Sequence, residues 1–358
     1  MILSLPELRR HAVARSLFAP VALGAAIDAL GFVQADPIRA PARAQDLILR
    51  HRVVGYRAGD LERRYAELDV EEDFFVNYGF LPRRLQALMH PRGGFGAWPS
   101  PGARVGARVL AFVRERGPVH PRDVDDHFAH GAVRNYWGGS SSATTHALDH
   151  LHYRGALRVH GRDGGIRLYA ARDHGPRVTA PAARRARLDA LVDVVVGLYA
   201  PLPSATLSWL VRRLRHAAPQ WQGELTATLA RARRRLAHGV VDGMTYYWPV
   251  AETPDGAVPD AVRLLAPFDP VVWDRRRFEH LWGWAYRFEA YTPEARRQLG
   301  YYALPLLWRD QVIGWANVTR TPRALDVALG FVAGRAPRDR AFRPALEAEI
   351  AALRAFLI

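Results

Sequence analysis

One stretch of the chain, residues 117–169, constrains the fold more than any other. It opens on a Gly-Pro pair that begins a short helix, and a run of serines and threonines at 140–145 caps a second helix. Strand-like segments at 156–160 and 166–169 then flank a turn that is rich in glycine. Helix, helix and hairpin in this order predict a winged helix.

The second of these helices is the one that a winged helix offers to a DNA groove. Hydroxyl side chains at its start are therefore candidate DNA contacts, namely Ser142, Thr144 and Thr145. His146 and His150 have the spacing of a zinc-binding pair on one helix face. The His-Glu-x-x-His pattern, however, needs glutamate where this chain has Ala147, so we expect no metal there.

A similar order of segments returns after residue 180. Helical runs precede two short strands, at 182–199, 204–216, 223–236, 240–242 and 245–248. This pattern predicts another winged helix. Arg212 and Arg213 are candidate DNA contacts within it, although a solvated helix face explains such arginines equally well.

From about residue 260 the sequence becomes rich in aromatic residues, most of which we expect to pack in a core. Segments 262–270 and 301–320 have strand character, the latter as a hairpin about Arg309 and Asp310. They predict a small β-rich domain, closed by an amphipathic helix at 343–357. Arg309, at the hairpin turn, is a candidate contact with the DNA backbone.

The first 90 residues read as helical. Ser4, followed three residues later by Glu7, is typical of a helix start. Further helices are expected at 21–30, 41–50, 60–65 and 81–89, and their spacing suits a helix-turn-helix unit. Residues 93–106 are rich in Gly, Pro and Ser and predict a linker.

A polar pair, Gln34 and Asp36, interrupts this helical pattern. One helical run stops at Gly31, and Pro37 pushes Asp36 into extended geometry. Because residues two apart on an extended segment share a face, the amide and the carboxylate should lie side by side and could hold a water molecule. A polar pair at a helix junction is also a common capping arrangement, so the pair alone leaves both interpretations open.

Together these patterns predict an α+β fold of tandem winged-helix units with a small, β-barrel-like domain at the C-terminus. The expected domains are a helix-turn-helix unit at 1–95, winged helices at 105–178 and 180–255, and the β-barrel-like domain with its helix at 258–358.

The amino-acid composition excludes several classes of function. The formal charge of +15 suggests a polyanionic partner, and all 50 Lys+Arg residues are arginines. A chain without lysine has no lysine Schiff base, which excludes lysine-based lyase and pyridoxal chemistry. A chain without cysteine has no disulfide, thiolate zinc finger or cysteine-bound iron–sulfur cluster. No apolar run approaches the ~20 residues of a membrane span, and no signal peptide is evident, so we expect a cytoplasmic protein.

Three segments resemble motifs of the winged-helix DNA glycosylases that unhook interstrand crosslinks, the YcaQ/AlkZ family. Residues 32–38 resemble its Gln-x-Asp motif, residues 266–275 its Ser-Pro-Phe-Asp-Asn segment, and residues 300–305 its Gly-Tyr-Tyr-x-Leu-Pro strand. The similarity covers nearly the whole chain, in the family's order. Residue 266 is alanine in place of the usual serine, and residues 74–83 lack a histidine that many members carry, which bears on adduct preference more than on reaction class.

The resemblance implies a monofunctional glycosylase that hydrolyses the N-glycosidic bond of N7-alkylated purines in double-stranded DNA, including interstrand crosslinks, and leaves abasic sites. Asp36 would activate water and stabilise the sugar cation, and Gln34 would orient the water. No cofactor is required. Basic residues near the motif, Arg39, Arg43 and Arg50, are candidate phosphate contacts. We expect a monomer associated with the nucleoid.

The alternative is a non-enzymatic winged-helix regulator or architectural DNA-binding protein, whose function would tolerate substitution at residues 34 and 36. A metal-dependent nuclease is disfavoured because the sequence shows no carboxylate cluster.

Overall fold

The structure is a computed structural model that describes residues 4–93, 100–128, 132–134, 140–254, 256–321 and 325–357. The chain forms two compact units, each built from separate stretches of sequence. Unit 1 comprises residues 1–61, 192–210 and 231–358, and unit 2 comprises residues 62–191 and 211–230. The division into four domains made from the sequence stays a prediction.

Unit 1 begins with the helix expected at the N-terminus. Helix α1 (Leu5–Ser16) carries the capping box, because Ser4 accepts the Glu7 N–H while the Glu7 carboxylate accepts the Ser4 N–H. Helix α2 (Leu23–Leu30) ends at Gly31, which adopts the left-handed conformation that favours glycine at this position. Strand β1 (Val33–Gln34) follows directly.

Helix α3 (Ala44–Leu49) is shorter than the predicted helix at 41–50, since Arg43 still has extended geometry. Residues 35–43 form an irregular connection between β1 and α3.

The prediction that the first 90 residues are helical is wrong for residues 70–82. Helix α4 (Asp60–Arg63), the 3-10 helix η1 (Tyr65–Glu67) and helix α5 (Arg83–Met89) enclose a hairpin of β2 (Val70–Phe74) and β3 (Tyr78–Pro82). Glu71, Glu72 and Asp73 are each only 1% exposed on β2. Arginines of unit 2 neutralise them, including Arg158 on Glu71 and Arg92 on Asp73, so tertiary ion pairs override local helix propensity.

The prediction of a linker at 93–106 is wrong from residue 100 onward, where helix α6 (Ser100–Arg116) begins. Residues 94–99 of the predicted linker lie outside the described residues. A proline at the start of a helix is tolerated because the first N–H groups have no partner inside the helix.

The helices and hairpin predicted between residues 117 and 169 are present. Helices α7 (Pro121–Phe128) and α8 (Ala143–Arg154) precede the antiparallel pair β6 (Leu157–Asp163) and β7 (Ile166–Ala171). A short pair not predicted from the sequence, β4 (Ala132–Arg134) with β5 (Ser140–Ser142), comes directly before α8.

The second predicted series of helices and strands is also present. It runs through α9 (Pro181–Tyr199), β8 (Leu202–Pro203), α10 (Ser204–Arg213), η2 (Pro219–Glu224), α11 (Leu225–Arg235), β9 (Ala237–Val241) and β10 (Met244–Trp248). The three strands pair in the order β8-β10-β9. That these two series act as winged helices stays a prediction.

The C-terminal part of unit 1 is an open sheet rather than a barrel. Strands β11 (Val262–Leu264), β12 (Leu304–Trp308), β13 (Gln311–Arg320) and β14 (Leu325–Phe331) pair in this order. Among the described residues, β11 and β14 stay at the two edges, so the barrel-like prediction is wrong. Residues 265–303 form turns, helix α12 (Arg275–Trp282) and the 3-10 helix η3 (Glu294–Arg296) instead of the further strands that closure needs.

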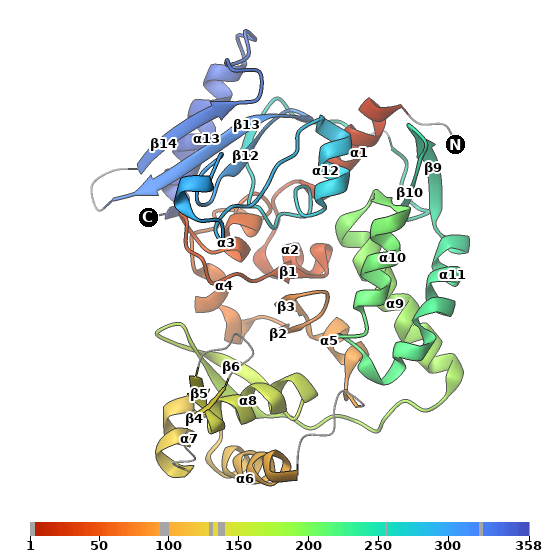
Figure 1. Ribbon diagram of the computed structural model, residues 1–358, viewed down its shortest axis with the longest axis vertical. Coiled ribbons are helices and arrows are strands. Elements are labelled where there is room, and N and C mark those ends of the chain that lie inside the picture. Colours follow the sequence, from red (N-terminus) through yellow and green to blue (C-terminus); the bar gives the residue numbers. More distant parts are fainter. Residues whose placement is uncertain are drawn as a thin grey trace. The chain divides into compact units, whose positions relative to one another are not determined.

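The hairpin predicted about Arg309 joins β12 to β13, and the predicted last helix is α13 (Phe342–Leu357). Helix α13 lies along the sheet and packs against β11 (Figure 1).

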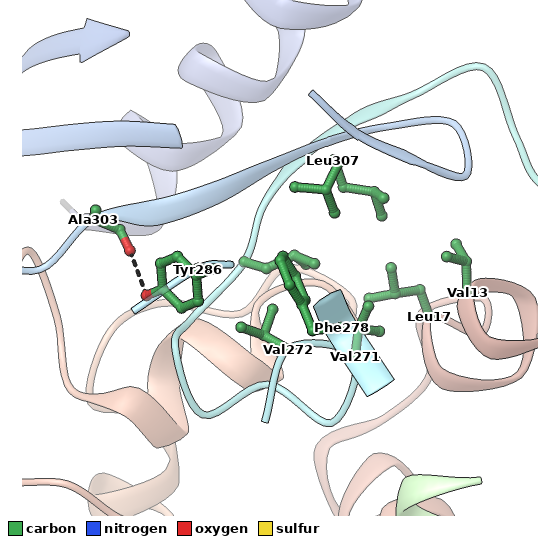
Figure 2. Packing of buried hydrophobic residues seen from close by; sticks show 10 residues of the cluster. Val13, Leu17, Val271, Val272, Phe278, Tyr286, Ala303 and Leu307 are labelled. Carbon is green, nitrogen blue, oxygen red and sulfur yellow. Dashed lines mark hydrogen bonds between the residues drawn. The ribbon is translucent and has the colours of Figure 1, made fainter. Parts of the chain in front are cut away.

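A hydrophobic core joins the first helix of unit 1 to this sheet. Val13 and Leu17 of α1 pack with Phe278 of α12 and with apolar residues around the sheet (Figure 2). The hydroxyl of buried Tyr286 donates to the carbonyl oxygen of Ala303 at 2.8 Å within this core. Among the described residues, no helix combines the length and the apolar character that a bilayer crossing demands.

Candidate functional site

Gln34 is buried at the end of β1, with 5% of its surface exposed. Its side-chain oxygen Oε1 accepts a hydrogen bond of 3.2 Å from the indole Nε1–H of Trp273. This bond orients the amide, because its oxygen faces the indole and its NH₂ group must therefore face elsewhere. Trp273 thus fixes the Gln34 side chain so that its NH₂ group can donate a hydrogen bond to another partner.

Asp36 is partly buried in the irregular segment after β1. Its Oδ1 accepts the backbone N–H of Ile38 at 2.9 Å, and its own backbone N–H donates to Oε1 of Gln45 at 3.3 Å. Among the described residues its second oxygen, Oδ2, has no hydrogen-bond partner. Burial raises the pKa of the Asp36 carboxyl above its ordinary value, and the Ile38 hydrogen bond offsets part of that rise. The carboxylate is therefore a stronger base than a solvated aspartate.

A buried ion pair fixes this region against residues 266–275. Arg52 and Asp269 are both fully buried, and two hydrogen bonds of 2.8 and 3.0 Å join the guanidinium to the carboxylate. Arg52 also donates to the carbonyl oxygens of Ser16 and Ile48. Asp269 accepts the backbone N–H of Val271, just before Trp273. The ion pair thus helps to hold the segment that carries Trp273 in place, so that its indole can bind Gln34.

Trp273 belongs to an aromatic stack within unit 1. Its ring stacks on Tyr199 at 4.5 Å between centroids, and Trp209 lies at 5.7 Å. Tyr199 is 1% exposed, whereas Trp209 is 45% exposed. The stack therefore anchors the indole that holds Gln34 and reaches the surface at Trp209.

A pocket of about 400 Å³ lies beside the same segment. Its lining includes Ala40, four residues after Asp36, and Tyr301 and Tyr302, which precede β12. After burial, the charge of Asp36 is the largest influence that raises the pKa of Tyr302, and it also raises that of exposed Tyr291. Tyrosine hydroxyls thus share the electrostatic environment of the candidate catalytic carboxylate.

The arginines predicted near the motif have different surroundings. Arg39 is exposed and Arg43 is partly buried. The side chain of Arg50 is only 3% exposed, pairs with Glu349 and donates to the Leu264 carbonyl oxygen, so its guanidinium has no surface from which to contact phosphate.

The other predicted DNA contacts also include both buried and exposed residues. Thr144 is 1% exposed, which makes it a buried residue of α8, while Thr145 is partly exposed and the side chain of Ser142 lies outside the described part. Arg212 is exposed, but Arg213 donates to the Val76 carbonyl oxygen within unit 2.

Arg309 pairs with Asp260 and Asp339 at 2.6 and 2.8 Å, and these two carboxylates offset its charge at the hairpin turn. Among the described residues, no group of three or more histidine or acidic side chains is arranged to hold a metal ion.

Sequence reasoning missed three residues around the candidate site, namely Gln45, Trp273 and Tyr302. The last two lie in the segments 266–275 and 300–305 that carried the resemblance, so co-occurrence with the Gln34–Asp36 segment was the available signal. No local pattern pointed to Gln45.

The sequence matches the family described as DNA glycosylase AlkZ-like over residues 27–356, a range that contains every residue of the site. The fold is similar to that of the Streptomyces sahachiroi DNA glycosylase AlkZ, with a TM-score of 0.65. The match covers 99% of this chain and 97% of that chain at 15% sequence identity. At this identity the structural match shows a common fold.

Proposed function

Because the chain belongs to the AlkZ-like DNA glycosylase family, we propose that it releases N7-alkylated purines from duplex DNA, including purines joined in interstrand crosslinks. It does so by hydrolysis, acts as a monomer, and leaves an abasic site. The observation that carries the proposal is a fixed amide, Gln34, two residues before a partly buried carboxylate, Asp36, whose Oδ2 has no hydrogen-bond partner among the described residues.

Alkylation at N7 gives the purine a positive charge, so the base can leave without a general acid. The C1′–N9 bond breaks and its electron pair neutralises the purine, which leaves a deoxyribose oxocarbenium ion. The Asp36 carboxylate stabilises this cation and takes a proton from the attacking water, whose oxygen bonds to C1′. The NH₂ group of Gln34 donates to that water and orients it.

The proposed chemistry stops at the abasic site, because a strand-cleaving lyase step commonly uses a lysine amine as its nucleophile and the sequence contains no lysine. A crosslinked base is also too large for a tight pocket of the kind that holds an ordinary flipped base. The proposed substrate range therefore calls for a shallow, open binding surface beside Asp36.

The test uses duplex DNA with one N7-methylguanine and a second duplex with an N7-alkylguanine crosslink, each incubated with protein and EDTA. Alkaline cleavage reports abasic sites. Wild-type protein is expected to release base, Asp36→Asn to lose nearly all release, and both to bind DNA equally. Binding without release by wild type on both duplexes would contradict the proposal and favour a non-enzymatic DNA-binding protein.

Two further arms define the reaction. Borohydride added during turnover should trap no covalent complex, and strand scission should require the alkaline step. Base release from the methylguanine duplex alone would restrict the substrate to monoadducts.

A further inference from the structure

Tyr302 is a buried residue whose hydroxyl is unused by the fold. Only 3% of its surface is exposed, and among the described residues its hydroxyl oxygen has no hydrogen-bond partner. Buried tyrosine hydroxyls normally find a partner, because burial without one costs free energy. Tyr286, in the same unit, follows that rule by donating to the Ala303 carbonyl oxygen. Tyr302, among the described residues, does not.

The loop that carries Tyr302 is held firmly in place. The buried Glu289 carboxylate accepts the backbone N–H groups of Gln298, Leu299 and Gly300 at 2.8–3.2 Å. Gly300 has φ +120°, and an added Cβ would lie 2.3 Å from the side-chain oxygen of Asn317, so only glycine fits. Asn317 in turn donates to the Leu299 carbonyl oxygen at 2.7 Å.

The ring of Tyr302 is fixed as well, since it meets the ring of Phe288 edge-on at 5.2 Å between centroids. A side chain positioned from both the backbone and the ring keeps its hydroxyl in one place. This is the preorganisation that a site for chemistry needs.

The surroundings of the hydroxyl connect it to Asp36. Tyr302 lines the pocket of about 400 Å³ together with Ala40, which follows Asp36 in the same segment. Burial and then the Asp36 charge raise the pKa of Tyr302 well above its ordinary value, with smaller contributions from Tyr286, Tyr291 and Tyr301. The hydroxyl therefore keeps its proton at neutral pH and is available there as a donor.

We propose that Tyr302 is a positioning residue for base release, whose hydroxyl donates a hydrogen bond to the water molecule that Asp36 holds. The role rests on the function proposed above. Asp36 and Gln34 then restrain the water from one segment and Tyr302 restrains it from another, so the oxygen keeps one orientation toward C1′. The hydroxyl gives up no proton and forms no bond to the substrate.

A tyrosine away from this pocket supplies a matched control. Tyr247→Phe removes the same hydroxyl from a partly exposed side chain of β10, a strand that pairs with β8 and β9 and contributes no residue to the pocket. Single-turnover base release from N7-methylguanine DNA is expected to fall about 10- to 100-fold in Tyr302→Phe. It should stay within about twofold of wild type in Tyr247→Phe, with DNA affinity unchanged in both. Equal rates in the two variants would overturn the proposal.

A second measurement needs no activity. The carboxyl carbon of Asp36 is titrated by NMR in protein labelled with ¹³C-aspartate, and the signal is assigned by its loss in Asp36→Asn. Loss of a donor near the carboxylate should raise the pKa of Asp36 in Tyr302→Phe and leave it unchanged in Tyr247→Phe. An unchanged pKa in Tyr302→Phe would also overturn the proposal. If wild type releases no base, the proposed function fails and the role of Tyr302 in base release fails with it, whatever the titration shows. If wild type releases base but Tyr302→Phe changes neither the rate nor the pKa of Asp36, only the role of Tyr302 fails.

Discussion

Asp36 combines two environments that act in opposite directions on its carboxyl group. Burial raises its pKa, while the backbone N–H of Ile38 stabilises the ionised form through one oxygen. The result is a carboxylate of increased basicity that the backbone holds in a fixed position. Buried Glu71 and Asp73 differ, since arginines neutralise them.

The first prediction concerns the pH dependence of base release. The active form is the carboxylate, so the rate should fall as pH decreases through the pKa of Asp36, which lies above the ordinary value of 3.8. Single-turnover rates between about pH 4.5 and 8 should trace this acid limb, once spontaneous depurination is subtracted. A rate that is independent of pH over the whole range would assign the base role to another group.

The second prediction concerns Trp273. Trp273→Phe keeps an aromatic ring against Tyr199 but removes the N–H that orients Gln34. Base release should fall about tenfold, and the free energy of unfolding should fall by only about 1 kcal/mol, the typical net value of one hydrogen bond. Trp282→Phe is the matched control, because its indole donates to the Asp310 carbonyl oxygen in the same unit. Equal effects on base release in both variants would show that the orientation of Gln34 does not matter.

At the level of elements, unit 1 brings together segments that are distant in the sequence. Gln34 at the end of β1 meets residues 266–275 through Trp273, and Arg52, which follows α3, pairs with Asp269. The loop before β12 carries Tyr302, which lines the pocket beside the Asp36 segment. Each of the three segments that resemble family motifs thus contributes to the candidate site.

The third prediction tests this arrangement. Asp269→Asn leaves the Arg52 guanidinium buried without its counter-charge, which should lower the free energy of unfolding by about 3–5 kcal/mol. Urea denaturation measures it. Glu347→Gln breaks the exposed pair with Arg343 on α13 and should cost less than about 0.5 kcal/mol. In the double variant Arg52→Met with Asp269→Leu, stability should recover in part, because both buried charges are gone.

For the molecule as a whole, the formal charge of +15 is larger than the positive charge that the surface can offer to DNA, because some arginines are buried. Arg52 and Arg277 are fully buried and Arg92 is 2% exposed, so these arginines stabilise the fold from inside. Arg50 and Arg213 bond to other parts of their own units. Affinity for DNA should therefore depend on a limited set of exposed arginines.

The fourth prediction concerns one of these. Arg39→Gln should weaken binding to duplex DNA of any sequence and reduce the slope of log K against log salt by about one. Arg343→Gln removes the same charge from an exposed site on α13, so it controls for net charge. Fluorescence anisotropy across a salt series measures both. Equal slopes for the two variants would exclude Arg39 as a phosphate contact.

Most of the helices and the hairpins after α8 and α11 follow from local sequence patterns, such as the left-handed Gly31 at a helix end and the turn residues of a hairpin. Gln34 and Asp36 were singled out by the resemblance of residues 32–38 to a family motif, and their role stays a prediction. The hairpin at 70–82 was not predicted, because its acidic residues are stabilised by arginines far along the chain. The open sheet was not predicted either, because closure of a barrel depends on residues 265–303. The inward position of Arg50, the hydrogen bond from Trp273 to Gln34 and the pocket that Tyr302 lines beside the Asp36 segment follow from the packing of the chain. Burial, charge pairing and the sharing of a pocket depend on which distant segments pack together, and no single stretch of sequence encodes that.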